Sequence, residues 1–133
     1  MSGSAALRAE WQPRVLSIVR IVVALLFMEH GTGKLLGFPP GTATPPMFGL
    51  LWFAGVVELV GGALLTVGLF TRIVAFVASG EMAVAYFMSH APQNFFPLLN
   101  SGDAAILYCF IFFYFFVAGG GAWSVDRLVL RRD

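Results

Sequence analysis

Four long apolar stretches, separated by short polar breaks, dominate the pattern of hydrophobic and polar positions along the chain. A helix rises about 1.5 Å per residue, so it needs about 20 apolar residues to cross a hydrocarbon core roughly 30 Å thick. The stretches therefore predict four membrane-spanning helices within a single domain that covers residues 1–133. The predicted spans are about 15–36, 47–70, 73–90 and 103–118.

The breaks between the stretches are rich in residues that stop helices. The first, GFPPGTATPP, contains four prolines and two glycines, and the third, HAPQNFFPLLNSG, has two more prolines. The second is only the pair Thr71 and Arg72, which predicts a tight turn. Short connections favour neighbouring antiparallel helices. The predicted fold class is therefore all-α, a transmembrane four-helix bundle.

Composition places this bundle in a lipid bilayer. Hydrophobic residues make up 59% of the chain and charged residues 11%, whereas soluble domains carry about 25% charged residues. The formal net charge of +1 gives no basic face for a nucleic acid. Cys109 is the single cysteine, so disulfide relays and cysteine clusters for metals are excluded, and we predict no metal site.

The basic residues predict the orientation of the bundle. Positively charged loops are retained on the cytoplasmic side of a membrane. Seven of the eight basic residues fall at one end of the predicted bundle, and only Lys34 falls toward the other. We therefore expect both termini to be cytoplasmic, in a multi-pass protein of the bacterial cytoplasmic membrane. The seven are Arg8, Arg14, Arg20, Arg72, Arg127, Arg131 and Arg132.

The N-terminal segment, residues 1–14, is polar and precedes the first apolar stretch, as the charged region of a secretory signal would. No small-residue cleavage pattern follows it, so we expect the first stretch to remain as a span. Arg20 and Arg72 are expected to be anchors at the inner interface, with buried stems and charged heads that reach water.

Four ionisable side chains lie inside the predicted spans at similar depths. Glu29 and His30 lie about 10 to 12 Å inside the outer end of the first span, at about 1.5 Å per residue. Glu58 and Glu81 lie about 16 and 13 Å inside their own spans by the same count. An ionised group in lipid costs about 2.5 to 3.5 kcal/mol, so such groups usually face the interior of a bundle. We predict that the four meet in one polar layer.

This layer has two interpretations. In the structural one, the carboxylates and cations pair only to fix the register of the helices. In the functional one, they form a proton-handling or ligand-binding pocket. The predicted catalytic residues are then Glu58 and Glu81, which exchange protons as a pair, and His30, whose charge changes nearest to neutral pH. The predicted ligand-binding residues are Glu29, Lys34, Asn100, Asp103 and Tyr108.

Individual features support or limit the functional interpretation. Lys34 is placed to neutralise an anionic group at the outer mouth, and Tyr108 to donate a hydrogen bond to a ligand carbonyl, although a neighbouring helix would also satisfy its hydroxyl. Gly55 and Gly62 share a face with Glu58, which favours close approach of helices, and Gly80 beside Glu81 is expected to act similarly.

Two cofactors can be weighed from the residues. His30 and His90 offer two imidazoles for an axially ligated haem, but a lone histidine at a helix end is more often satisfied by hydrogen bonds, and we favour that interpretation. The aromatic run at 110–116, FIFFYFF, would suit a quinone ring, although contact with lipid or core is the commoner role of such side chains.

The order of several short motifs resembles the DoxX family of small four-helix membrane proteins over nearly the whole chain. Asn-Gly-Gly-Glu would be expected where Asn100 to Asp103 stand, so the acid is kept but shortened. The motifs are Arg20; His30-Gly31-x-x-Lys34-x-x-Gly37; Glu58-x-x-Gly61-Gly62; Gly68-Leu69-x-Thr71-Arg72; Asn100-Ser101-Gly102-Asp103 with Tyr108; and Gly119-Gly120-Gly121-x-Trp123-Ser124-x-Asp126.

The resemblance implies an architecture more than an activity. Relatives in that family include the membrane subunit of a thiosulfate:quinone oxidoreductase, and a membrane component associated with superoxide dismutase and a sulfurtransferase. The expected function is thus a membrane subunit of a redox system that binds a quinone or similar small molecule. It would need a redox partner protein, because no group in this chain carries electrons by itself. It could also form homo-oligomers. The alternatives are a non-enzymatic anchor or assembly subunit for an oxidoreductase, and a small transporter.

Overall fold

The structure is a computed structural model that describes residues 2–132. Over these residues the regular elements are all helices, which confirms the predicted all-α class. Helix α3 continues without a break into one π-helical turn, η1. The elements are α1 (Gly3–Leu36), α2 (Leu50–Val67), α3 (Thr71–Ala85), η1 (Tyr86–His90), α4 (Pro97–Asn100), α5 (Asp103–Ala118) and α6 (Val125–Leu128).

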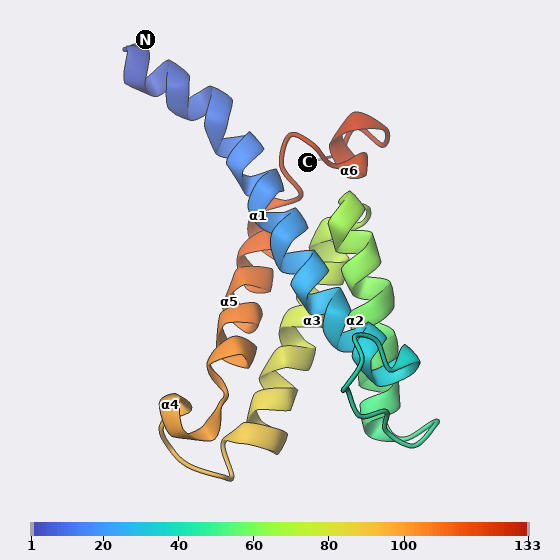
Figure 1. Cartoon of the computed structure of the whole chain (residues 1–133). Helices are drawn as coiled ribbons and strands as arrows, with labels where there is room; N and C mark the ends of the chain where they lie inside the picture. The colour runs from blue at the N-terminus through green and yellow to red at the C-terminus, as the bar shows by residue number, and fades with distance from the viewer. Residues whose placement is uncertain (1, 133) are drawn as a thin grey trace.

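Three helices of the described chain are long and apolar enough to cross a membrane: α1, α2, and the continuous helix of α3 and η1. Three of the four predicted spans therefore have spanning length. The fourth, α5, is apolar but has 16 residues, about 24 Å of helix. The short α4 and its flanking loop precede α5 at the same end of the molecule (Figure 1).

Helix α1 is much longer than the span predicted from residue 15. Its 34 residues extend about 51 Å, and its first turns project away from the other helices (Figure 1). The Ser2 side chain caps this end by accepting a hydrogen bond from the Ala5 N–H at 3.4 Å. Alanine, leucine, arginine and glutamate follow, and all are good helix formers. The polar N-terminal segment is therefore an exposed extension of the first helix.

The helices pack as two antiparallel pairs, α1 with α2 and α3 with α5. Figure 1 shows the pairs converging at the end that carries both termini and separating toward the opposite end. Within the first pair the backbones touch. A Cβ at Gly31 would lie 2.4 Å from the Leu59 nitrogen, and one at Gly62 would lie 2.6 Å from the Met28 Cβ. The predicted close approach at Gly62 is confirmed.

A buried arginine joins the helices where they converge. Arg20 of α1 is completely buried and donates hydrogen bonds to the carbonyls of Leu65 (2.8 Å) and Thr66 (3.3 Å) in α2. It also donates to Gly120 and, at 2.9 Å, to Trp123 in the segment after α5. Carbonyls in the last turn of a helix lack partners inside that helix, and Arg20 donates hydrogen bonds to two of them at the end of α2. The predicted contact of its head with water is wrong.

The glycine-rich C-terminal motif completes this junction. A Cβ at Gly121 would lie 2.4 Å from the Ser17 hydroxyl, so only glycine lets the segment pass α1 this closely. The Asp126 carboxylate accepts hydrogen bonds from the backbone N–H groups of Phe70 (2.7 Å) and Thr71 (2.8 Å), where α3 begins. Three helices and the C-terminal segment are therefore fixed together here.

The apolar core lies between this junction and the far end of the bundle. Phe27 and Phe112 are fully buried and meet edge to face, with ring centroids 4.7 Å apart. In the aromatic run of α5, Phe112 and Phe115 belong to the core, whereas Phe110 and Phe113 are exposed on the outer surface. Below Phe27 two cavities form between the helix pairs.

Candidate functional site

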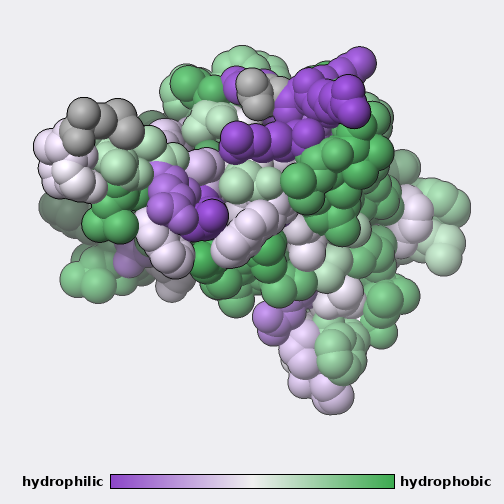
Figure 2. Space-filling view, turned by 90° about the horizontal axis from the view of Figure 1, so that it is seen from above, coloured by the Kyte–Doolittle hydropathy of each residue, from purple (hydrophilic) through white to green (hydrophobic). Residues whose placement is uncertain are grey.

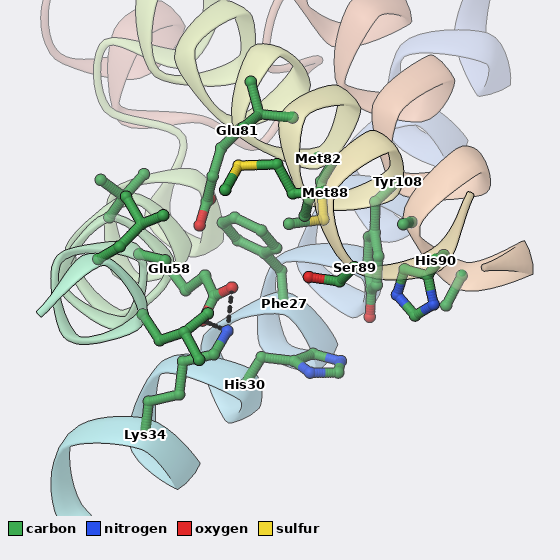
Figure 3. A pocket seen from close by; sticks show the side chains of 18 of the residues that line it. Phe27, His30, Lys34, Glu58, Glu81, Met82, Met88, Ser89, His90 and Tyr108 are labelled. Atoms are coloured by element: carbon green, nitrogen blue, oxygen red, sulfur yellow. Dashed lines mark hydrogen bonds and ion pairs between the residues drawn. The ribbon is translucent and has the colours of Figure 1, made fainter. Parts of the chain in front are cut away.

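A cavity of about 590 Å³, the first cavity, lies between α2 and α3 where the two helix pairs separate. Its walls are mostly apolar, and its polar side chains come from all four long helices (Figure 3). They are His30, Lys34, Glu58, Glu81, His90 and Tyr108, together with two serines. An apolar cavity with a few convergent polar groups is the usual form of a small-molecule site.

Lys34 and Glu58 form an ion pair across α1 and α2. The Lys34 ammonium donates to both carboxylate oxygens of Glu58, at 2.6 and 2.7 Å. The Glu58 side chain is 3% exposed and that of Lys34 26%, so the pair is largely shielded from solvent. Gly55, one turn before Glu58, makes room for the lysine, because a Cβ there would lie 2.9 Å from the Lys34 Cβ.

Glu81 is a buried carboxyl group with unmet hydrogen-bonding capacity. Within the described chain, neither of its oxygens has a hydrogen-bond partner, and both are buried. Figure 3 shows its carboxyl group directed toward Glu58 from α3. A buried ionised group without a partner is strongly unfavourable. Glu81 is therefore suited to hold a proton beside the Lys34–Glu58 pair and to donate it, or a hydrogen bond, to a group in the cavity.

Two histidines and a tyrosine line the other side of the first cavity (Figure 3). The His30 and Tyr108 rings meet edge to face, with centroids 6.0 Å apart. The His90 Nδ1 is 2.9 Å from the carbonyl oxygen of Asn100, which fixes the orientation of the ring. His90 lies in the π-helical turn η1, a type of irregularity that is frequent at functional sites.

The structure brings together three members of the predicted polar layer, His30, Glu58 and Glu81. Glu29, the fourth, is exposed on another face of α1 and lines a different cavity. Consecutive residues of a helix point about 100° apart, so a common depth does not bring Glu29 into the first cavity with His30.

Asn100 and Asp103 do not line the first cavity. The fully buried Asn100 side chain donates to the Asn94 carbonyl (2.9 Å) and the Tyr86 hydroxyl (3.2 Å), and accepts from the Gly102 N–H (2.8 Å). It therefore holds the segment between η1 and α5 in place. Asp103 is exposed in the first turn of α5.

Sequence reasoning did not single out Ser89, which also lines the first cavity from η1. Its signal is the spacing of Glu81, Ala85 and Ser89, which follow one another at four-residue intervals along one helix face. Gly80 differs from the prediction too, since a Cβ there would meet nothing within 4 Å. It borders the first cavity and makes no close helix contact.

A second cavity of about 380 Å³ lies between α1, the loop after it, and α5. Glu29 lines it, together with Pro39 and Thr42 of the loop. His30, Lys34 and Tyr108 line both cavities, so these three side chains form the boundary between the two. In the described chain, no cluster of three or more histidine, cysteine, aspartate or glutamate side chains could hold a metal ion.

The sequence profile of the DoxX family matches residues 15–91, which run from α1 through η1. The chain belongs to the DoxX family. The matched region contains His30, Lys34, Glu58, Glu81 and His90, and so includes the polar lining of the first cavity except Tyr108 and Ser101.

Two relatives are similar to this DoxX protein over almost their whole length. An uncharacterized protein of Haemophilus influenzae is 43% identical over 132 residues, which covers 92% of this chain and 96% of the relative. An uncharacterized membrane protein of Mycobacterium tuberculosis is 30% identical over 159 residues, covering 99% of this chain and 94% of the relative. No solved structure matches the chain. Family, relatives and apolar helices together identify a membrane protein.

Proposed function

We propose that this DoxX protein is a membrane-embedded subunit of a redox system that binds a quinone, or a similar small molecule, in the first cavity. Its bundle has four spans, with α5 as the fourth, and both termini face the cytoplasm. Figure 2, which looks onto the end carrying the termini, shows hydrophilic side chains gathered there among apolar ones. Seven of eight basic residues belong to this end by sequence, which supports a cytoplasmic location in a bacterial membrane.

The observation that carries the proposal is the unpartnered Glu81 carboxyl group beside the Lys34–Glu58 pair in an apolar cavity. A quinone has an apolar ring and carbonyl oxygens that accept hydrogen bonds and protons. A cavity of about 590 Å³ lies within the usual range of roughly 300 to 1,000 Å³ for small-molecule sites. Its apolar walls suit the ring, and its few polar groups suit the carbonyls.

The roles of the residues follow from their positions. Glu81 and Glu58 exchange protons with the ligand, and His30 connects them to the boundary between the cavities. Lys34 and Tyr108 are donors that orient a ligand carbonyl. Reduction of a quinone to a quinol takes two electrons and two protons. A partner redox protein supplies the two electrons. Glu81 supplies one proton, and it takes up a second proton from water, by way of Glu58, to complete the quinol.

Titration of a short-tailed benzoquinone into the purified protein in nanodiscs tests the proposal. We expect saturable quenching of tryptophan fluorescence and a rise in melting temperature. Tyr108→Phe should weaken binding roughly tenfold, the loss of one buried hydrogen bond. Tyr114→Phe is the matched control, since Tyr114 lies on the same helix but is exposed and outside the first cavity. The absence of saturation in the unmodified protein would refute the proposal.

A second candidate function is a non-enzymatic anchor or assembly subunit for an oxidoreductase. One observation favours it: the Lys34–Glu58 pair joins α1 to α2, as a purely structural pair would. Exchanging Glu81 for Gln separates the two candidates. An anchor keeps the activity of the host pathway in this variant, whereas a proton-transferring site loses most of it.

A further inference from the structure

The second cavity has a polar wall that reaches inside the end of α1, the first of the proposed spans. The loop after α1 folds back along that helix, so that Thr42 lies beside Gly33, one turn inside its end. The Thr42 hydroxyl donates to the Pro39 carbonyl at 2.9 Å and lies 3.3 Å from the Gly33 carbonyl oxygen. Irregular backbone at membrane depth is tolerated only where protein buries it or water fills the space beside it. Residues 41–44 are exposed, so the second condition applies.

Glu29 adds a carboxyl group to the same wall. It lies seven residues before the last residue of α1, about 10 Å along the helix axis, and its side chain is exposed. Facing lipid, an ionised carboxylate at such a depth would cost about 2.5 to 3.5 kcal/mol. Water in the second cavity would hydrate it and remove most of that cost. The loop backbone and Glu29 therefore both indicate a hydrated space.

The second cavity meets the first at His30, Lys34 and Tyr108, which line both. The titratable groups facing the second cavity are Glu29, His30 and Lys34 from α1 and Tyr108 from α5. We propose that the second cavity is a water-filled inlet through which protons reach Glu58 and Glu81, with Glu29 and His30 as the relaying side chains. This inference rests on the proposed proton-coupled function of the first cavity. The step moves protons only, and the electrons come from the redox partner.

The first cavity opens on a different face of the molecule. The residues that border it are Leu50, Leu51 and Phe53 of α2, Val84 of α3 and Met88 of η1, and all five are more than half exposed. These apolar side chains form an opening toward lipid. A lipid-soluble ligand therefore has its own route, between α2 and α3. Ligand and protons approach the Lys34–Glu58 pair from separate sides.

Thiol accessibility tests the inlet without any ligand. In a Cys109→Ala background, single cysteines replace Glu29 and Thr42 in the second cavity, and Leu25 on α1 as the control. Leu25 is exposed but lines neither cavity and lies one turn from Glu29. Intact cells or spheroplasts receive a charged, membrane-impermeant methanethiosulfonate reagent. A thiolate forms only where water reaches the sulfur, so Glu29→Cys and Thr42→Cys should react roughly tenfold faster than Leu25→Cys, or more.

The outcomes separate the inlet from the proposed function. Equal, slow labelling at all three positions would overturn the inlet, even if the benzoquinone binds saturably. Fast labelling at Glu29→Cys and Thr42→Cys without any benzoquinone binding would refute the quinone site and leave a hydrated cavity. If Glu29→Cys fails to accumulate, Thr42→Cys decides the question, because that side chain lies in a loop. A lipid-soluble maleimide added after denaturation counts the thiols in every variant.

Discussion

Lys34 and Glu58 show how single residues determine the chemistry of the first cavity. Their pair satisfies both charges within 2.7 Å, and Glu81 beside it is a buried carboxyl group with no hydrogen-bond partner in the described chain. A charge pair in low dielectric is tolerated because each charge stabilises the other. Removing one member therefore has a larger effect than removing both.

We predict that Lys34→Met lowers the free energy of unfolding by about 3 kcal/mol, because it leaves Glu58 buried and unpaired. The double variant Lys34→Met with Glu58→Gln should recover most of this loss, since no buried charge remains. Thermal unfolding in detergent micelles measures both. A single variant as stable as the unmodified protein would show that the pair contributes nothing to the packing of α1 on α2.

Arg20 provides the second prediction at this scale. Replacing it with Met removes a donor from four backbone carbonyls, of which Leu65 and Gly120 keep a second donor, and should lower the free energy of unfolding by roughly 3 kcal/mol. Arg14→Met is the control. Arg14 pairs with the exposed Glu10 and lies over the Trp11 ring, both on the projecting part of α1, so its loss should cost under about 1 kcal/mol. Similar melting temperatures for the two variants would contradict the structural role of Arg20.

Residue types alone do not predict which cavity Glu29 lines or that Arg20 is buried. The sequence shows that Glu29 and His30 lie at one depth, but their direction depends on the rotation of α1 about its axis. That rotation is fixed by the contacts of Gly31 with Leu59 of α2 and of Gly62, in α2, with Met28 of α1. Arg20 was expected to reach water because it lies near the inner end of the first span. Its actual partners are backbone carbonyls, which leave no mark in a sequence.

At the scale of the elements, α1 and α2 pack through glycines, whereas α3 borders open space at Gly80. The sequence predicted the small-residue face of α2 from the spacing of Gly55, Glu58 and Gly62. It predicted the same role for Gly80 because a glycine beside a buried acid has the same local pattern. Whether a neighbouring helix fills that position is decided by tertiary structure.

This contrast predicts opposite effects of two alanine substitutions. Gly31→Ala should destabilise the protein by about 2 kcal/mol, because its methyl group would meet the α2 backbone at 2.4 Å. Gly80→Ala should be neutral or slightly stabilising, since its methyl group meets nothing within 4 Å and alanine favours helix. Unfolding in a graded series of denaturing detergent compares them. Equal losses would mean that the gap beside Gly80 is closed in the membrane.

For the whole molecule, composition and the length of the apolar stretches were enough to predict an all-helical membrane protein. A bilayer of fixed thickness restricts helix length, so the first three spans follow from counting residues. The site depends on how the two helix pairs separate, and no periodicity in the sequence encodes that separation. Asn100 illustrates the limit, because its buried role depends on how the segment between η1 and α5 folds.

The proposed orientation gives a prediction for the whole chain. Alkaline phosphatase fused after Thr42 or Gln93 should be active, because both loops lie at the end opposite the termini (Figure 1). Fusion after Arg132 should give no phosphatase activity but a fluorescent green fluorescent protein, as expected for a cytoplasmic end. Phosphatase activity after both Thr42 and Arg132 would refute the four-span topology, since three spans between these two points must put them on different sides.

The junction at Arg20 also has a mechanical consequence. The hydrogen bonds of Arg20 join the two helix pairs at the end that carries the termini, and the pairs separate toward the opposite end. A small rotation of one pair about this junction would therefore change the distance between the pairs most at the far end. The space around Glu58 and Glu81 can thus widen or narrow while every helix keeps its own hydrogen bonds. In the proposed orientation, lateral pressure in the outer leaflet would act on the separated ends of the two pairs, and the width of the site would then depend on the surrounding lipid.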